Sequence, residues 1–243
     1  MITTNHITPE QLHESLKNIK VGGTVCHYSL KKCAELVPVI NEINELKEEK
    51  NAVILAHSYV SPEIVYGVAD YVGDSYALSK NAMETSADLI VFAAVRFMGE
   101  TAKIMNPGKE VLIPTALDGC TLADSITAED VRRLRKQFPD YAFVCYINTT
   151  AEVKAECDVC VTSSNVYKIV ERVPGDKIYF LPDKLMGQNL VNEMHARGVH
   201  KTISYYTGTC YVHEEYGKDQ IFRIRTEYPN VKVVSHPECN PAV

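Results

Sequence analysis

Short apolar runs alternate with amphipathic stretches along most of the chain. Runs such as AVILA (52–56) and DLIVFAA (88–94) have the length and continuity of strands that are covered on both faces. The stretches between such runs carry apolar residues at helical spacing, and strands that alternate with helices form parallel sheets. The pattern therefore predicts an α/β fold with parallel sheets and helices on both sides of each sheet.

A pattern of helix, turn, strand and polar strand end occurs three times, at a period of about 90 residues. The polar strand ends are His57, Tyr146 and His236, which are 89 and 90 residues apart. A repeat of this length predicts units of similar structure. We expect an N-terminal helical extension, two complete units and the start of a truncated third unit, with bounds 1–50, 51–124, 125–213 and 214–243.

Two cysteines occupy corresponding places in the repeat. Cys120 lies in the loop after an apolar strand in VLIPTALDGCTLAD (111–124), and Cys210 lies in the corresponding loop of TISYYTGTCYVH (202–213), 90 residues later. The carboxyl ends of parallel strands are where α/β sheets place their chemistry. The pair is therefore the first candidate for a functional site. The same period would put a third cysteine at about position 300, beyond the last residue.

Polar residues at two other places each allow two interpretations. Alternation along a strand puts His57 and Tyr59 on one face, either as site residues or as a capped core histidine beside a packed tyrosine. Residues 71–75 are predicted to form a turn into a helix, with Gly73, Asp74 and Ser75 at the start of that helix. There they can bind an anion through backbone N–H groups and a hydroxyl, or they can cap the helix.

Cys157 and Cys160 have the spacing of zinc-binding and redox-active cysteine pairs. The same residues fit the start of a strand, with Cys160 packed inside beside Val159 and Val161. The sequence holds no second pair of this spacing that could complete a four-cysteine zinc site. A zinc protein is therefore the less favoured interpretation.

The composition narrows the class of protein. The chain has 243 residues, of which 46% are hydrophobic and 23% charged, and its net charge is −6. These values are typical of a soluble globular protein, and they give no broad electrostatic footprint for nucleic acid. No apolar run approaches the roughly 20 residues of a membrane span, and the N-terminus lacks the order of a signal peptide. We expect a cytoplasmic protein whose cysteines stay reduced.

Nine sequence blocks follow one another from about residue 50 to the C-terminus. They read AHSYV, ADYVGDS, VRFMGETAKIMNP, DGCTLAD, CYINTTAEVKA, VTSSN, LPDKLMGQN, GTCYVHE and SHPEC. In order and spacing, these blocks resemble the quinolinate synthase family, and the resemblance covers about four fifths of the chain.

The resemblance implies a fold and a cofactor. The family has three similar three-layer α/β/α sandwich domains around a pseudo-threefold axis, and each domain sends one cysteine to a central [4Fe-4S] cluster. Cys120 and Cys210 match the first two ligands. The third ligand belongs to the third domain, most of which this chain lacks. An iron without a protein ligand can act as a Lewis acid on the substrate.

The resemblance also implies a transferase reaction in the de novo synthesis of NAD. The family condenses iminoaspartate with dihydroxyacetone phosphate to give quinolinate, and L-aspartate oxidase or aspartate dehydrogenase would supply the iminoaspartate. We expect Glu238 to be the principal base. The residues that match the family's site are, as catalytic groups, His57, Tyr59, Tyr146, His236 and Glu238 and, as substrate-binding groups, Ser75, Asn148, Thr162, Ser163 and His213.

Two interpretations of the whole chain follow. The first is the iron–sulfur enzyme, present as a truncated chain. The second is a non-catalytic homologue that binds a small dicarboxylate or phosphate ligand without a stable cluster. The retained site residues favour the enzyme, whereas the missing third cysteine ligand favours the second interpretation.

Overall fold

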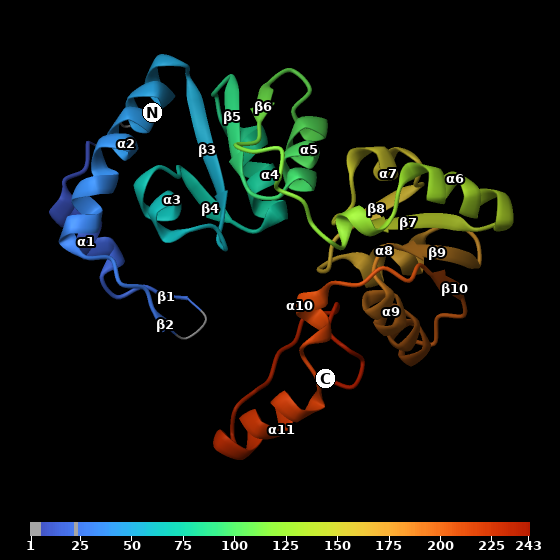
Figure 1. Ribbon diagram of the computed structural model, residues 1–243. Coiled ribbons are helices and arrows are strands. Elements are labelled where there is room, and N and C mark those ends of the chain that lie inside the picture. Colours follow the sequence, from blue (N-terminus) through green and yellow to red (C-terminus); the bar gives the residue numbers. More distant parts are fainter. Residues whose placement is uncertain (1–5, 22–23) are drawn as a thin grey trace. The chain divides into compact units, whose positions relative to one another are not determined.

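The computed structural model describes residues 6–21 and 24–243 and, within them, all side chains except those of Val21, Thr24, Ser75 and Tyr76. The chain divides into two compact units, unit 1 (Met1–Asp118) and unit 2 (Gly119–Val243). Each unit contains its own four-stranded sheet (Figure 1). The finer division of the chain into four segments remains a prediction.

Unit 1 is built on a parallel sheet with the strand order β4-β3-β5-β6. Its strands are β3 (Ala52–His57), β4 (Tyr71–Gly73), β5 (Leu89–Ala93) and β6 (Glu110–Leu112). Its helices are α1 (Pro9–Leu16), α2 (Leu30–Glu49), α3 (Pro62–Gly67), α4 (Ser75–Glu84) and α5 (Arg96–Met105). A two-stranded antiparallel pair, β1 (Lys20–Val21) and β2 (Thr24–Val25), lies between α1 and α2 in the sequence.

Unit 2 is built on a parallel sheet with the strand order β10-β9-β7-β8. Its strands are β7 (Ala142–Tyr146), β8 (Val159–Val161), β9 (Lys177–Leu181) and β10 (Thr202–Tyr205). Its helices are the 3₁₀ turn η1 (Ala123–Ser125), α6 (Ala128–Gln137), α7 (Ala151–Ala155), α8 (Val166–Arg172), α9 (Lys184–Ala196), α10 (Tyr211–Glu214) and α11 (Lys218–Glu227).

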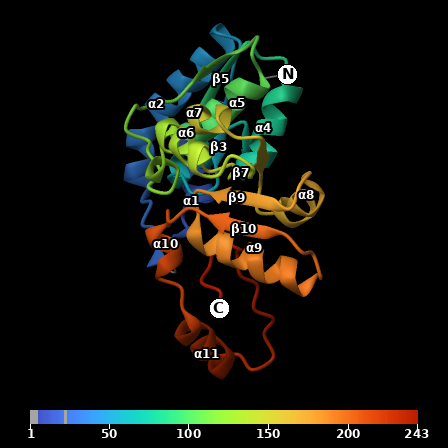
Figure 2. The same ribbon diagram turned by 90° about the vertical axis from the view of Figure 1, so that its right-hand side faces the viewer.

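The two sheets share one topology. In each unit the first strand lies between the second and the third, and the fourth strand forms an edge. Figure 2 shows α6 and α7 on one face of the sheet of unit 2 and α9 on the other face. The predicted α/β fold of repeated units with parallel sheets is therefore confirmed.

Both faces of the sheet in unit 2 carry apolar side chains, as the continuous apolar runs predicted. Val144 and Phe180 face the cluster that α8 and α9 complete, and both are fully buried. Phe143 and Leu181, one residue away on the same strands, face the cluster on the side of α6 and α7. Successive side chains of a strand point to opposite faces, so a strand covered on both faces is apolar throughout.

Two helices begin at a capping threonine. Thr8 caps α1, with Pro9 in the first turn, and its hydroxyl accepts a hydrogen bond from the Gln11 N–H. Thr127 caps α6 and exchanges hydrogen bonds with Asp130 in a capping box. In both helices the cap satisfies N–H groups that would otherwise have no partner.

Two local predictions are wrong. Tyr71–Gly73, expected as a turn, forms the edge strand β4, because its backbone pairs with β3 even though its side chains are largely exposed. Residues 231–235 before His236, expected as a strand, form none. A strand needs a hydrogen-bonded neighbour, and none of the described strands pairs with this segment.

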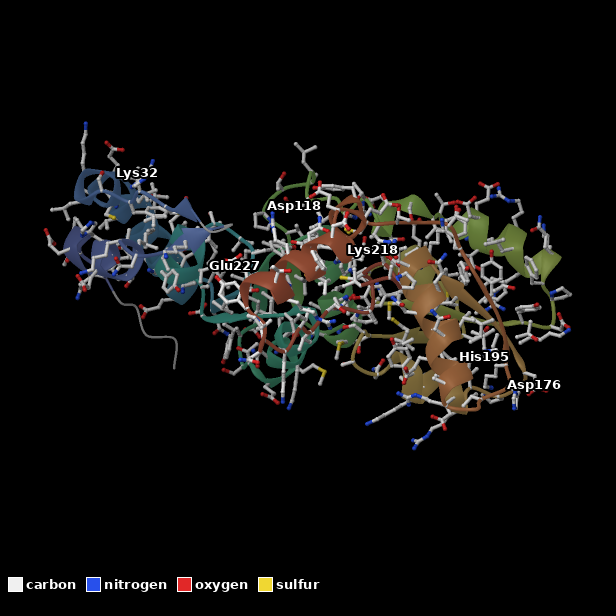
Figure 3. All side chains as sticks on the ribbon, turned by 90° about the horizontal axis from the view of Figure 1, so that it is seen from below. Lys32, Asp118, Asp176, His195, Lys218 and Glu227 are labelled. Carbon is white, nitrogen blue, oxygen red and sulfur yellow. The ribbon has the colours of Figure 1, made fainter. Side chains whose placement is uncertain are left out.

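The helix before that segment, α11, has no buried residue. Lys218 and Glu227 form the ends of α11, and both are labelled in Figure 3. Phe222 on this helix is 75% exposed.

Among the described helices of the chain, none is long and apolar enough to cross a membrane.

Replacing Gly187 with alanine should destabilise unit 2 by about 1–3 kcal/mol. A methyl group at this position of α9 would lie 2.6 Å from the Cβ and Cγ atoms of Tyr205 on β10. The Cβ atom of Tyr205 is fixed by the backbone and cannot rotate away, so the clash outweighs the roughly 1 kcal/mol that alanine gains over glycine in a helix. Urea unfolding measures the change.

Gly108→Ala is the matched control for this substitution. No atom lies within 4 Å of a methyl group at Gly108. The free energy of unfolding should therefore change by no more than about 0.5 kcal/mol. An equal loss of stability in both variants would contradict the close packing of α9 on β10.

Candidate active site

The first part of the site in unit 2 lies where β7 and β8 end together. Tyr146 is the last residue of β7 and pairs in register with Val161 on β8, so Ser163 follows at the same edge of the sheet. Tyr146 is 5% exposed, and the side chains of Ser163 and Glu238 lie close enough to its hydroxyl to affect its pKa. Burial, followed by the negative charge of Glu238, raises the pKa of Tyr146, which keeps the phenol protonated.

Glu238 is the centre of the site. Glu238 is 3% exposed, and its Oε2 atom lies 3.0 Å from Nδ1 of His236 and 3.7 Å from Nε2 of His213. The two imidazole rings stack, with centroids 5.8 Å apart. The fold therefore brings together five of the predicted residues, Tyr146, Ser163, His213, His236 and Glu238.

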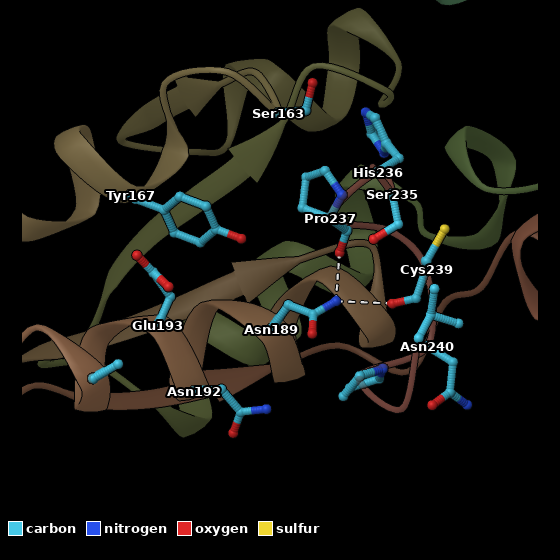
Figure 4. Close-up of a pocket in the computed structure, with 13 residues that line it drawn as sticks. Ser163, Tyr167, Asn189, Asn192, Glu193, Ser235, His236, Pro237, Cys239 and Asn240 are labelled. Atoms are coloured by element: carbon cyan, nitrogen blue, oxygen red, sulfur yellow. Dashed lines mark hydrogen bonds between the residues drawn. The ribbon is translucent and has the colours of Figure 1, made fainter. Parts of the chain in front are cut away.

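The segment that carries His236 is tied to α9 by a residue that the sequence did not single out. Asn189 donates hydrogen bonds of 2.7 and 2.8 Å to the carbonyl oxygens of Pro237 and Cys239 (Figure 4). These bonds fix the segment at both sides of Glu238. A pocket of about 530 Å³ opens beside it, lined in part by Asn189 and His236. The only sequence signal for this residue was its place in the block LPDKLMGQN.

Asp183 is a second residue that sequence reasoning missed. It caps α9, with the Met186 N–H donating to its Oδ1 at 2.6 Å, and it is fully buried. Its Oδ2 atom has no hydrogen-bond partner among the described residues. Burial and the nearby Glu238 raise the pKa of Asp183 to about 7, against the opposing effects of helix N–H groups and of His236. In the sequence it looks like an ordinary helix cap.

Cys120 and Cys210 are neighbours in unit 2. Both are half-buried and pack against the same apolar cluster. Burial raises the pKa of the Cys120 thiol, the N–H groups of Ala123 and Leu122 at its sulfur oppose this rise, and the adjacent Cys210 adds to it. Neighbouring thiols with N–H groups directed at sulfur fit the ligand set of an iron–sulfur cluster.

Glycines allow the close turns of the two cysteine loops. The Cys120 N–H donates to Oδ2 of Asp124 at 3.0 Å, and a Cβ atom at Gly119 would lie 2.9 Å from that same oxygen. A Cβ atom at Gly208 would lie 2.7 Å from the carbonyl oxygen of Pro182. Glycine is therefore required at position 208, two residues before Cys210, because a backbone oxygen lies so close. At Gly119 the Asp124 carboxylate could move, at the expense of its hydrogen bond with the Cys120 N–H.

The other predicted residues of unit 2, Asn148 and Thr162, lie at the same strand ends. Among the described residues, neither makes a hydrogen bond or ion pair with Glu238. Asn148 is half-buried and follows β7. The Thr162 N–H donates to Oδ1 of Asn165 at 2.7 Å, and its hydroxyl lies 2.9 Å from that of Ser164. A role for Asn148 or Thr162 in binding remains a prediction.

In unit 1, His57 and Tyr59 lie together at the end of β3. Their ring centroids are 4.0 Å apart, and the Tyr59 hydroxyl accepts a hydrogen bond of 3.0 Å from the Val95 N–H. Burial lowers the pKa of His57, an effect that Asp74 opposes, so the ring is held near its neutral form. Ser75 begins α4, but its side chain lies outside the described residues.

Cys157 and Cys160 contact a third thiol. Cys145 on β7 is paired in register with Cys160 on β8, and Cys157 packs against the apolar cluster that contains Cys145. A hydrogen bond with Cys157 and burial raise the pKa of Cys145 to about 12, while Cys160 opposes the rise. In the described part of the chain, the one group of three close metal-ligand side chains is His213, His236 and Glu238.

Comparisons with known proteins agree on one family. The family model described as quinolinate synthetase A protein matches residues 41–243. Quinolinate synthase 2 of Mesorhizobium japonicum is 49% identical over 204 residues, which are 84% of this chain and 61% of that protein. The quinolinate synthase of Aquifex aeolicus is 48% identical over 209 residues, 86% of this chain and 63% of that protein.

A third relative matches a longer part of this chain. The quinolinate synthase of Xylella fastidiosa (strain 9a5c) is 44% identical over 238 residues, 94% of this chain and 69% of that protein. This chain thus spans about three fifths of the length of the first two relatives. With a family match over residues 41–243 and relatives of this similarity, the chain belongs to the quinolinate synthetase A family.

Proposed function

We propose that this chain carries quinolinate synthase chemistry, the condensation of iminoaspartate with dihydroxyacetone phosphate to quinolinate in NAD synthesis. The observation that supports it most directly is the convergence of Tyr146, His213, His236 and Glu238 in unit 2. Because the chain belongs to this family, the convergence of these residues supports the family's reaction.

The reaction requires loss of phosphate, imine formation and dehydration, so protons must be removed and returned several times. Glu238 is the proposed principal base, because its carboxylate contacts both imidazoles and the Tyr146 hydroxyl. His236 is the partner that takes up and returns the proton. Tyr146, which burial keeps protonated, donates a hydrogen bond to an oxygen that gains negative charge.

Further groups in each unit are proposed to bind or act on the substrates. In unit 2, Ser163, Thr162 and Asn148 are proposed to hold carboxylate or phosphate oxygens, together with His213. In unit 1, His57 and Tyr59 are proposed as catalytic groups and Ser75 as an anion-binding hydroxyl at the start of α4.

Cys120 and Cys210 are the residues that would hold a [4Fe-4S] cluster. When bound, such a cluster supplies a Lewis acid that polarises a substrate oxygen or nitrogen. The loops contribute the half-buried thiols and the N–H groups of Leu122 and Ala123 at the Cys120 sulfur. These N–H groups tune the electron density on that sulfur.

The substrates also suggest a cellular setting. Iminoaspartate is short-lived in water, because an imine hydrolyses, so an enzyme that forms it from aspartate must act close by. L-aspartate oxidase or aspartate dehydrogenase is the proposed supplier, and a cytoplasmic location is proposed for the pair.

The test is quinolinate formation by the anaerobically reconstituted protein, supplied with dihydroxyacetone phosphate and with iminoaspartate generated from oxaloacetate and ammonia. We expect quinolinate, identified by mass, and phosphate in equal amounts. Binding of the substrates without any quinolinate would contradict the proposal and would favour a non-catalytic homologue.

A further inference from the structure

Three side chains in unit 2 have the geometry of a metal site. The potential ligand atoms of His213, His236 and Glu238 all lie within 4.8 Å of one another. Zinc bonds of about 2.1 Å in a tetrahedral arrangement separate neighbouring donor atoms by about 3.4 Å. The separations from Glu238 Oε2 are 3.0 Å to His236 Nδ1 and 3.7 Å to His213 Nε2, on either side of that value. An ion of this size therefore requires the three ligand atoms, which lie within 4.8 Å of one another, to approach to about 3.4 Å.

No lysine or arginine of the described chain forms an ion pair with the buried carboxyl group at this site. Glu238 is 3% exposed and Asp183 is fully buried, and the two carboxyl groups interact electrostatically. The ion pairs of Glu238 within the described chain are with His213 and His236 alone, neither of which carries a permanent charge. Buried carboxylates are normally paired with a cation or bound to a metal.

Two polar atoms of the proposed ligands also have no partner. Oε1 of Glu238 and Nδ1 of His213 are buried and make no hydrogen bond to any described residue. A buried polar atom without a partner costs roughly 1–3 kcal/mol. These two buried atoms are not the two, Glu238 Oε2 and His213 Nε2, that lie nearest to each other. Each of the two side chains therefore has one further polar atom available to a metal ion, a bound water or a ligand group, and this points to an occupant at the site.

The segment that carries two of the three ligands is held by an outer residue. Asn189 donates to the carbonyl oxygens of Pro237 and Cys239, on either side of Glu238 (Figure 4). Outer residues that fix metal ligands typically change metal affinity 10–100-fold when they are removed. Asn189 therefore gives a way to test the site without altering a ligand.

We propose that His213, His236 and Glu238 form a binding site for a divalent cation of the zinc type, with Asn189 as its supporting residue. Two imidazoles and one carboxylate are a common donor set of zinc sites that keep one position open, whereas magnesium and calcium prefer oxygen ligands. A bound ion would occupy the lone pairs that proton transfer needs, so zinc acts here as an inhibitor of the proposed chemistry. Metal binding itself does not depend on that chemistry.

The probe is Co²⁺, which replaces zinc and reports its ligands in the visible spectrum. We expect one Co²⁺ per chain of the metal-free, reduced protein to give visible bands without sulfur-to-cobalt charge transfer. His213→Gln and Glu238→Gln should each weaken this binding at least tenfold, and a Cys120→Ser, Cys210→Ser double variant should keep it. Unchanged affinity in both ligand variants, or sulfur bands lost in the cysteine variant, would overturn the proposal.

The matched pair Asn189→Ala and Asn192→Ala covers the case in which a ligand variant does not fold. Both asparagines lie on α9 and line the same pocket, but Asn189 holds the Pro237 and Cys239 carbonyls. Asn189→Ala should bind Co²⁺ about 10–100-fold more weakly and Asn192→Ala within twofold of wild type. Equal affinities would contradict the site. Because no turnover is measured, this result and a failure to form quinolinate are separate outcomes.

Discussion

Glu238→Gln is expected to lower the turnover of quinolinate formation by about 10²–10⁴-fold. Glutamine keeps the size and shape of the side chain but cannot accept a proton at neutral pH. It also removes the charge that lies 3.0 Å from Nδ1 of His236, so both members of the proposed proton-transfer pair are altered. Single-turnover quinolinate formation, measured after metal content has been matched to wild type, gives the ratio directly.

The control for this prediction is Glu129→Gln. Glu129 is an exposed carboxyl in the first turn of α6 and contacts none of the proposed site residues in the described structure. Its turnover should stay within about twofold of wild type, since surface changes away from special features have small effects. If Glu238→Gln also kept most of its turnover, another group would have to be the principal base.

Asp183→Asn is expected to make the protein increasingly more stable than wild type as the pH rises. Folding raises the pKa of Asp183 from 3.8 to about 7, first because of burial and then because of Glu238, with Tyr146 and His236 also close by. Between these two pKa values the native state binds more protons than the unfolded state. The stability that this carboxyl contributes is therefore present at low pH and is lost as the pH rises to about 7.

The size of the effect follows from the difference between the pKa values of Asp183 in the unfolded and the folded state. Each tenfold change in proton affinity corresponds to about 1.4 kcal/mol, so wild type should lose about 3 kcal/mol relative to the asparagine variant between pH 5 and pH 8. Asparagine retains the cap of α9, because its carbonyl oxygen can accept from the Met186 N–H. Urea unfolding at the two pH values, with a chelator present, measures the change.

Thr150→Ala separates this titration from the loss of a helix cap. Thr150 caps α7 with an uncharged hydroxyl that accepts from the Val153 N–H. Its replacement should cost about 1 kcal/mol equally at both pH values. A stability difference between wild type and Asp183→Asn that does not change with pH would show that Asp183 does not hold a proton in the folded state.

The sequence predicted the repeated fold because each unit carries its own complete hydrophobic pattern. Continuous apolar runs such as 52–56 require cover on both faces, and the period of about 90 residues predicted the shared topology of the two sheets. The edge strand Tyr71–Gly73 was missed, since its exposed side chains and terminal glycine look like a turn. Residues 231–235 have the composition of a strand, but pairing, which composition does not reveal, decides whether a strand forms.

The residues of the candidate site were also predicted only in part from the sequence. Resemblance to the family selected Tyr146, His213, His236 and Glu238, and the structure adds that three segments distant in sequence bring them together. Asp183 and Asn189 could not be selected, because a capping aspartate and a helical asparagine have no distinctive spacing. Their importance comes from burial of Asp183 and from the carbonyl groups that Asn189 holds, and both are properties of the folded chain.

The central claim, that the chain is a cluster-dependent member of its family, is tested most directly by its iron and acid-labile sulfide content. After anaerobic reconstitution, we predict about four irons and four sulfides per wild-type chain. Cys120→Ser and Cys210→Ser should each reduce both values to near zero, whereas Cys160→Ser should leave them unchanged. Iron near zero in wild type, or a full complement in both of the first two variants, would contradict the claim.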